Sequence, residues 1–375
     1  MKSTNKVFDF LEYKVAKATQ IDTQSICIFR IIFGLFTLFF GWKSYSWLGS
    51  VPDTFFSPPV LSIASLFSEF PPSIFFYGLD VCIATAVIAL TIGAFTRFST
   101  TSLFVLLVVA NSFNYSLGKI DHGFLYLCVL LVMQFKNWGE FFSVDYLLFS
   151  RQKKLDDQAT SQPLDNLWLL AVFIAFGFFT AGFGKAIAWL DFDLSTSGFL
   201  SWLYNGYYNL GRDQLLASFV IDLDWPLLWE LLDISAVIFE LGFLWAMFSQ
   251  RSWYIWLTIA CSFHLANCLL LNIPFTGNSI VYLAFVPWSQ VGALRYLVTH
   301  HIRKILLAVL AVCGLALALS VSLGSSFDGL AYYFAEAAQL QESKLIIGCV
   351  LWGCCLFIFG WVIVRLKLFL PNGAV

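Results

Sequence analysis

A lysine lies inside a stretch of the sequence that is otherwise apolar or small, and its chemistry can be argued from that setting. The stretch FGFFTAGFGKAIAWL (176–190) contains Lys185, with Trp189 one helical turn later. An ionised group at membrane depth costs about 2.5–3.5 kcal/mol on insertion scales. Loss of water favours the neutral amine, which can accept a proton from a phenol-like hydroxyl. Lys185 is therefore a candidate general base, and a lysine that extends to the lipid–water interface is the alternative interpretation.

Two of the four histidines could act beside such a base. His122 precedes one apolar run, and His264 lies inside another, three residues before Asn267. Residues three apart share one face of a helix. A neutral imidazole there could hydrogen-bond the oxyanion of a deprotonated substrate. We take Lys185, His122 and His264 as candidate catalytic residues, and a structural hydrogen bond between helices is the alternative for each histidine.

Acidic residues add to this set. Asp233 and Glu240 are seven residues apart in DISAVIFELGF, so they lie on one helical face. Ionisable residues inside membrane helices usually face the interior of the bundle. We expect substrate contacts from Asn267, Glu240, Asp121 and Trp189. We predict no metal site, because two histidines without suitably placed carboxylates or cysteines make a poor zinc ligand set. The nine cysteines fit small buried apolar residues.

The composition indicates the elements that position these residues. The chain has 375 residues, of which 59% are hydrophobic and 12% charged. Soluble domains carry about 25% charged residues. The sequence therefore predicts an all-α, polytopic transmembrane helix bundle. The formal net charge of −2 gives no reason to expect binding to nucleic acid. We therefore expect the lipid bilayer to be one of the partners of this chain.

Runs of apolar residues predict about ten spans. Each lies between polar residues, proline or glycine, and the third and fourth are short for a helix that crosses a membrane. The predicted spans are 26–47, 74–95, 100–114, 124–135, 167–189, 227–248, 253–271, 280–297, 302–323 and 345–368.

Lysine and arginine indicate the orientation of these spans. With the N-terminus in the cytoplasm, most of the 21 Lys and Arg residues, Arg30 included, fall on the cytoplasmic side. This bias is the one that membrane proteins follow. Both termini are therefore predicted to be cytoplasmic, and His300 and His301 to lie in a cytoplasmic loop. The same alternation places Lys185, His122 and the outer half of the 253–271 span on the external side.

The sequence divides into three parts. Residues 1–25 are charged and mildly amphipathic, which predicts a cytoplasmic surface helix. Residues 26–297 form the main transmembrane domain, and 298–375 add two C-terminal transmembrane helices. In the external loop after the fifth span, FLSWLYNGYYNL (199–210) alternates aromatic and apolar groups, which suits a helix or re-entrant segment at the lipid boundary. A cover over a substrate entrance is the second interpretation.

Four motifs in order resemble one known family. They are RIIFG (30–34), DHGFLYLCVLLVMQFKNWGEFFSVDYLL (121–148), FFTAGFGKAIAWL (178–190) and FHLANCLLLNIPF (263–275). Together they are similar to the horizontally transferred transmembrane (HTTM) domain of the vitamin K-dependent gamma-carboxylases. The resemblance covers roughly 26–288. It implies that Lys185 is the essential base, that His122 assists at a quinone oxygen and that His264 is the histidine of the FH-x-x-N helix.

The resemblance also implies a reaction. The family oxidises vitamin K hydroquinone with oxygen, and the base so formed deprotonates glutamate before carbon dioxide adds. AIAWL follows Lys185 where the family has an acidic segment. We therefore expect quinol- or oxygen-linked acid–base chemistry on a peptide or lipid, with a reduced quinone, oxygen and carbon dioxide as cofactors. A small secreted peptide is the expected partner, and a bacterial cell membrane the expected location. The alternative is a non-enzymatic partner or transporter in peptide maturation or export.

Overall fold

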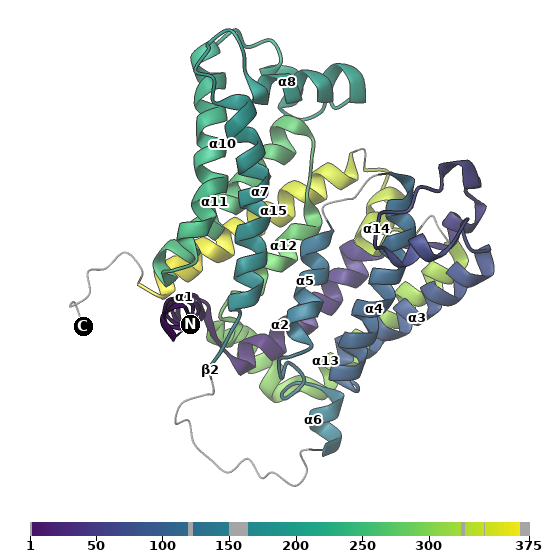
Figure 1. Cartoon of the computed structure of the whole chain (residues 1–375). Helices are drawn as coiled ribbons and strands as arrows, with labels where there is room; N and C mark the ends of the chain where they lie inside the picture. Colours follow the sequence, from purple (N-terminus) through teal and green to yellow (C-terminus); the bar gives the residue numbers. More distant parts are fainter. Residues whose placement is uncertain (1, 119–122, 150–163, 324–326, 341, 368–375) are drawn as a thin grey trace. The chain divides into compact units, whose positions relative to one another are not determined.

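In the part of the chain that the structure describes, the protein is helical with two short strands. The computed structural model describes residues 2–118, 123–149, 164–323, 327–340 and 342–367. The strands in this part of the chain are β1 (Gln20–Asp22) and β2 (Leu164–Asn166), which pair with each other in one sheet. This architecture confirms the predicted all-α class (Figure 1).

The chain divides into two compact units that are each built from separate segments. Unit 1 contains residues 1–20, 166–286 and 342–375, and unit 2 contains 21–165 and 287–341. The predicted boundaries at 25/26 and 297/298 divide the chain into consecutive stretches, whereas each compact unit combines separate stretches. The predicted boundaries therefore stay predictions.

Unit 1 is a group of long helices with shorter ones at their ends. Its first helix, α1, confirms the helix predicted near the N-terminus, and its residues Val7, Phe8 and Phe10 are exposed. The helices are α1 (Lys2–Ala18), α7 (Trp168–Trp189), α8 (Gly198–Tyr204), α9 (Ala217–Val220), α10 (Pro226–Ala246), α11 (Gln250–Leu271), α12 (Thr276–Leu283) and α15 (Ser343–Arg365), with a helical turn η7 (Asn205–Asn209) after α8.

Close backbone contact joins α7 to α10. A Cβ atom built at Gly182 would lie 2.7 Å from the Cβ of Glu240, so only glycine fits there. One turn earlier, the ring of Phe178 stacks on that of Phe243 with centroids 4.2 Å apart. Next to this pair, the Trp256 indole of α11 donates to the Phe239 carbonyl of α10 at 3.0 Å. Small residues and ring stacking are the usual means of packing helices in a membrane.

The segment 199–210 is helical, as one of its two interpretations expects. It forms α8 and η7, which bury Phe199 and Leu203 and expose Trp202 and Tyr208. The side chain of Asp233 on α10 accepts hydrogen bonds from the backbone of Gly198 and Phe199, at 2.8 and 2.7 Å. This carboxylate therefore caps α8, because the first N–H groups of a helix have no partner within it.

Unit 2 is built around α2, α3, α4 and α13. Its helices are α2 (Thr23–Phe36), α3 (Ser73–Ile92), α4 (Thr96–Asn114), α5 (Phe124–Met133), α6 (Val144–Phe149), α13 (Gly292–Leu323) and α14 (Leu330–Ala337). Short helical turns connect them: η1 (Thr37–Gly41), η2 (Ser46–Ser50), η3 (Asp53–Phe55), η4 (Ile63–Leu66), η5 (Tyr115–Leu117) and η8 (Trp288–Gln290).

Arg30 holds the turn between α3 and α4. Its side chain is wholly buried, and its guanidinium donates to the carbonyls of Leu90 at 3.4 Å and Phe142 at 2.5 Å. Gly93, at φ +71°, leaves the guanidinium its space. Arg30 is thus an internal cross-link of unit 2 rather than a loop cation.

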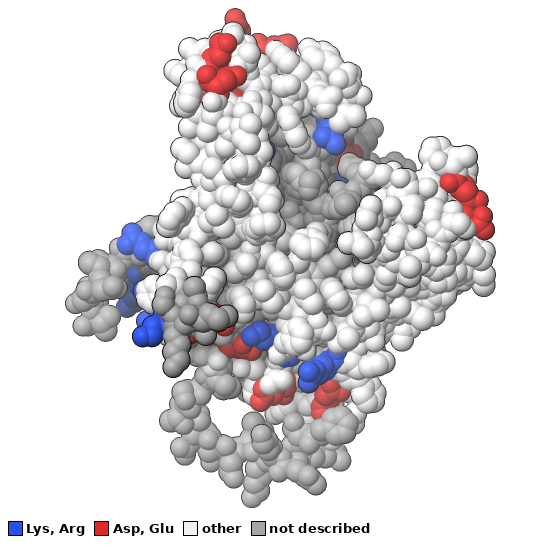
Figure 2. Space-filling model, viewed as in Figure 1, with Lys and Arg blue, Asp and Glu red and all other residues white. Residues whose placement is uncertain are grey.

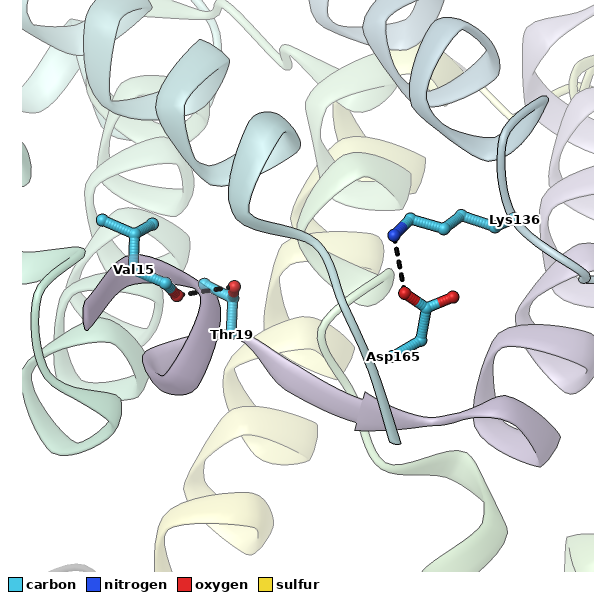
Figure 3. Close-up of polar contacts among 4 residues, drawn as sticks. All are labelled: Val15, Thr19, Lys136 and Asp165. Carbon is cyan, nitrogen blue, oxygen red and sulfur yellow. Dashed lines mark hydrogen bonds and ion pairs between the residues drawn. The ribbon is translucent and has the colours of Figure 1, made fainter. Parts of the chain in front are cut away.

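An ion pair closes the basic loop after α5. Lys136 Nζ lies 2.6 Å from Asp165 Oδ1, and Figure 3 shows the two side chains facing each other. The sequence between them includes residues outside the described part. In unit 1, the same figure shows the Thr19 hydroxyl donating to the Val15 carbonyl at 2.8 Å, which ends α1.

Seven helices in the described residues are long and apolar enough to cross a membrane. They are 23–50, 73–92, 96–117, 168–189, 250–271, 292–323 and 343–365. The helix α5 is shorter, and α10 contains three acidic residues. The sides of α7, α10 and α11 seen in Figure 2 are largely uncharged, and acidic side chains gather at the end near α8.

The prediction of one helix over 280–297 is wrong. The helix α12 ends at Leu283, and α13 begins at Gly292. Pro287 lies between them; proline has no N–H for a helix and restricts the residue before it. The predicted span 302–323 is the second part of α13, which bends at His301 (φ −125°, ψ 21°). His300 therefore lies in a helix and His301 at the bend of α13, where the prediction had a loop.

Candidate functional site

Lys185 forms an ion pair inside unit 1. It lies in the last turns of α7, and its ammonium donates to Oε1 of Glu240 on α10. The side chain of Glu240 is 3% exposed and that of Lys185 is 21% exposed. The lysine thus has an enclosed anion as its partner and keeps partial access to the surroundings.

Two aromatic rings flank the same ammonium. Lys185 Nζ is 5.2 Å from the ring centre of Trp189 and 5.8 Å from that of Phe263 on α11. Contacts between a cation and an aromatic face contribute about 0.5–2 kcal/mol, more where water is excluded. The predicted residues Lys185, Glu240 and Trp189 therefore meet, and the charged form of the lysine is stabilised by three groups.

The sequence around this pair explains its geometry. Gly182 lies three residues before Lys185, on the same face of α7, and it brings α10 close enough for the carboxylate to meet the ammonium. Glu240 and Asp233, predicted to share a face, are both buried. Asp233 is used for capping α8, whereas Glu240 is the one that faces Lys185.

The second carboxylate oxygen of Glu240 has no hydrogen-bond partner among the residues that the structure describes. Oε2 is fully enclosed, and no donor from the described residues reaches it. A buried acceptor without a donor costs about 1–3 kcal/mol. Such an atom is suited to accept a proton.

His264 lies in a neighbouring aromatic cluster. Its Nε2 is 2.9 Å from the Tyr282 hydroxyl, and its ring stacks on Trp352 of α15 with centroids 4.5 Å apart. The Phe263 ring, which faces Lys185, is 5.7 Å from the His264 ring. The two candidate catalytic side chains thus share Phe263 as a neighbour, and His264 is 3% exposed.

Asn267 lies one turn after His264, as predicted, and is 7% exposed. Its backbone carbonyl accepts from Ile273 at 3.2 Å, which closes the end of α11. His122 and Asp121 lie outside the described residues, so their assignments stay predictions.

An acidic turn follows α7. The backbone of Asp193 at 3.0 Å and the hydroxyl of Thr196 at 2.8 Å donate to the carboxylate of Asp191. These hydrogen bonds hold the pKa of the Asp191 carboxyl below its usual range. The turn is exposed and ties down the chain that leaves the site.

Sequence reasoning missed two residues of the aromatic cluster, Tyr282 and Trp352. They lie on α12 and α15, far along the chain from His264, and their letters have no special spacing. The sequence signal that could have suggested Trp352 is its position in an apolar span, which it shares with many buried aromatic residues. Among the described residues, no group of three His, Cys, Asp or Glu side chains is arranged to hold a metal.

Comparison with known proteins gives no relative from which a role could be transferred. The chain matches no protein-family model, no curated protein and no solved structure.

Proposed function

We propose that this chain is a membrane-embedded, gamma-carboxylase-like enzyme that performs quinol- or oxygen-linked acid–base chemistry at Lys185 and Glu240. The observation that carries the proposal is the ion pair of these two residues among aromatic rings, with one carboxylate oxygen left without a donor. Placing an ion pair in apolar surroundings costs free energy of desolvation. Ionisable residues inside membrane helices usually mark functional sites.

The pair provides a route for a proton. Transfer of one proton from the Lys185 ammonium to Glu240 gives a neutral amine and a neutral acid. The amine can then take the proton of a phenol-like hydroxyl. The base in this scheme is the pair of Lys185 and Glu240. The sequence had suggested a lysine that becomes neutral through loss of water, without a carboxylate to take its proton.

The surroundings fit an aromatic hydroxyl compound. Trp189 and Phe263 offer ring faces beside the ammonium, and no donor among the described residues occupies Glu240 Oε2. A reduced quinone, when bound, would supply the acidic hydroxyl and the electrons that oxygen accepts. In this proposal His264 and His122 hydrogen-bond the oxyanion, and Asn267, Asp121 and Trp189 contact the substrate. Carbon dioxide and a small secreted peptide or a lipid are the proposed further reactants.

The proposal includes a topology. The site opens to the external side of a bacterial cell membrane, and the N-terminus is cytoplasmic. The predicted count of about ten spans included one helix over 280–297, which the structure replaces with α12 and the start of α13, so that count and the cytoplasmic C-terminus derived from it stay predictions. The seven long apolar helices support insertion in a membrane. The excess of lysine and arginine on one side supports the orientation.

Turnover of a hydroquinone by Lys185 variants tests the proposal. We expect Lys185→Ala to lose at least about 100-fold in kcat, as is typical of a lost acid–base group. Lys185→Arg keeps a cation for Glu240 but cannot become a neutral base, so we expect the same loss. The matched control is Lys136→Ala, which breaks the Lys136–Asp165 ion pair and should leave turnover unchanged.

Equal turnover in the wild type and both Lys185 variants contradicts an enzymatic role for this residue. That result favours the non-enzymatic alternative, a partner or transporter in peptide maturation or export.

A further inference from the structure

Two cysteines from distant parts of the chain meet between α11 and α15. Cys268 lies in the last turn of α11, and Cys349 lies near the start of α15. Their sulfur atoms are 3.3 Å apart, and both are reduced. A disulfide bond needs about 2.05 Å between the sulfurs, so a shift of little more than an ångström would allow the bond to form.

The backbone fixes this meeting. A Cβ atom at Gly348, next to Cys349, would lie 3.2 Å from Cys268 Sγ and 2.6 Å from the Cβ of Pro274. One turn further, the Trp352 indole donates to the Pro274 carbonyl at 2.6 Å. The glycine lets α15 approach the end of α11, and the hydrogen bond sets its register. The two thiols are therefore held together by the packing of two helices.

One of the two cysteines is partly exposed, so a reagent can reach the pair. Cys268 is buried, whereas Cys349 is half-buried. Both lie in helices that are long and apolar enough to cross a membrane. An oxidant that reaches them must dissolve in the bilayer and accept two electrons, and quinones have both properties.

We propose that Cys268 and Cys349 are an oxidative modification site, which a membrane-dissolved quinone converts into a disulfide. Each thiol loses its hydrogen, one S–S bond forms, and the quinone takes up the two electrons and two protons to become a hydroquinone. The bond joins α11 to α15 and holds Trp352 against His264, on which it stacks. This site is independent of proton transfer at Lys185.

The test uses the reduced full-length chain in lipid nanodiscs with a fully substituted benzoquinone. Thiols cannot add to the ring of such a quinone, so it can act only as an oxidant. Free thiols are then alkylated, and the protein is digested without reductant. Trypsin can cut after Arg295, Arg303 and Lys304, between the two cysteines. We expect a linked peptide that reductant separates, and one hydroquinone formed per chain. A parallel sample receives hydrogen peroxide in place of the quinone.

Two variants assign the bond. Cys349→Ala should lose the linked peptide. Cys355→Ala should keep it, because it changes only the neighbouring pair, in which Cys355 hydrogen-bonds Cys261. A linkage that persists in Cys349→Ala and disappears in Cys355→Ala overturns the assignment. Alkylation of both thiols in quinone-treated wild type overturns the proposal without any variant. A linked peptide that forms with hydrogen peroxide but not with the quinone overturns it as well.

Discussion

The central feature at the scale of residues is the pairing of Lys185 with Glu240. The sequence indicated both as functional candidates and placed Trp189 one turn from the lysine, and the structure brings these three together. Their pairing could not be read from the sequence, because it joins residues 55 positions apart on different helices. Periodicity shows which face of α10 carries Glu240, but the neighbour of that face depends on tertiary packing.

Breaking the ion pair should affect stability as well as activity. Glu240→Gln leaves the ammonium without its anion, and we expect a loss of about 1–3 kcal/mol in unfolding free energy. Removing one partner of a fully buried pair costs about 3–5 kcal/mol, and the partial exposure of Lys185 reduces this. The measurement is thermal or denaturant unfolding in detergent.

The double variant Lys185→Met with Glu240→Leu provides the control for that result. Replacing both charges should restore stability without restoring turnover. A single variant as stable as the wild type would show that the pair contributes little.

Arg30 is expected to matter only for folding. Arg30→Met removes the donors to Leu90 and Phe142. The Leu90 carbonyl keeps the Gly93 N–H at 3.0 Å, whereas the Phe142 carbonyl loses the guanidinium, which costs about 1–3 kcal/mol. Unfolding measurements should show this loss with kcat unchanged in the folded fraction. Arg97→Met, at an exposed position of α4, is the control and should change stability by less than about 0.5 kcal/mol.

At the scale of elements, the sequence located most of the long helices. The predicted span 167–189 corresponds to α7 (Trp168–Trp189), and 253–271 lies within α11 (Gln250–Leu271). Long apolar runs have this advantage because their backbone must be helical in lipid. The interpretation of 280–297 was wrong because hydropathy continues across Pro287, whereas the helix does not.

The contact between α7 and α10 can be tested with two neighbouring glycines. Gly182→Ala would place its Cβ 2.7 Å from that of Glu240, whereas a Cβ at Gly184 meets nothing within 4 Å. We expect Gly182→Ala to separate the helices, lowering stability by about 1–3 kcal/mol and turnover with it. Gly184→Ala should leave both unchanged. Equal effects of the two substitutions would contradict a required close approach.

At the scale of the whole molecule, composition alone predicted a helical membrane protein, and the seven long apolar helices agree with it. The bias of charges predicted the orientation. It could not predict that Arg30 is buried within unit 2, because the count treats each cation as if it lay in a loop. It also could not predict the two units, because each combines segments that are far apart in the sequence.

The orientation can be measured by labelling single added cysteines. Ser218, before α10, and Gln250, at the start of α11, are both exposed. In intact cells, a membrane-impermeant maleimide should label Ser218→Cys, and it should label Gln250→Cys only after the membrane is opened. The wild type, which has nine native cysteines, is the control for labelling at positions other than the added one. Labelling of both added thiols from one side would mean that α10 does not cross the membrane.

Rescue of Lys185→Ala by an added amine tests the central claim most directly. This variant leaves a space beside Glu240 that a small primary amine such as ethylamine can fill. If Lys185 transfers protons, hydroquinone turnover by Lys185→Ala should be low and should rise with ethylamine concentration, whereas Lys185→Arg should not respond. Turnover by Lys185→Ala at the wild-type rate without any amine would contradict the account.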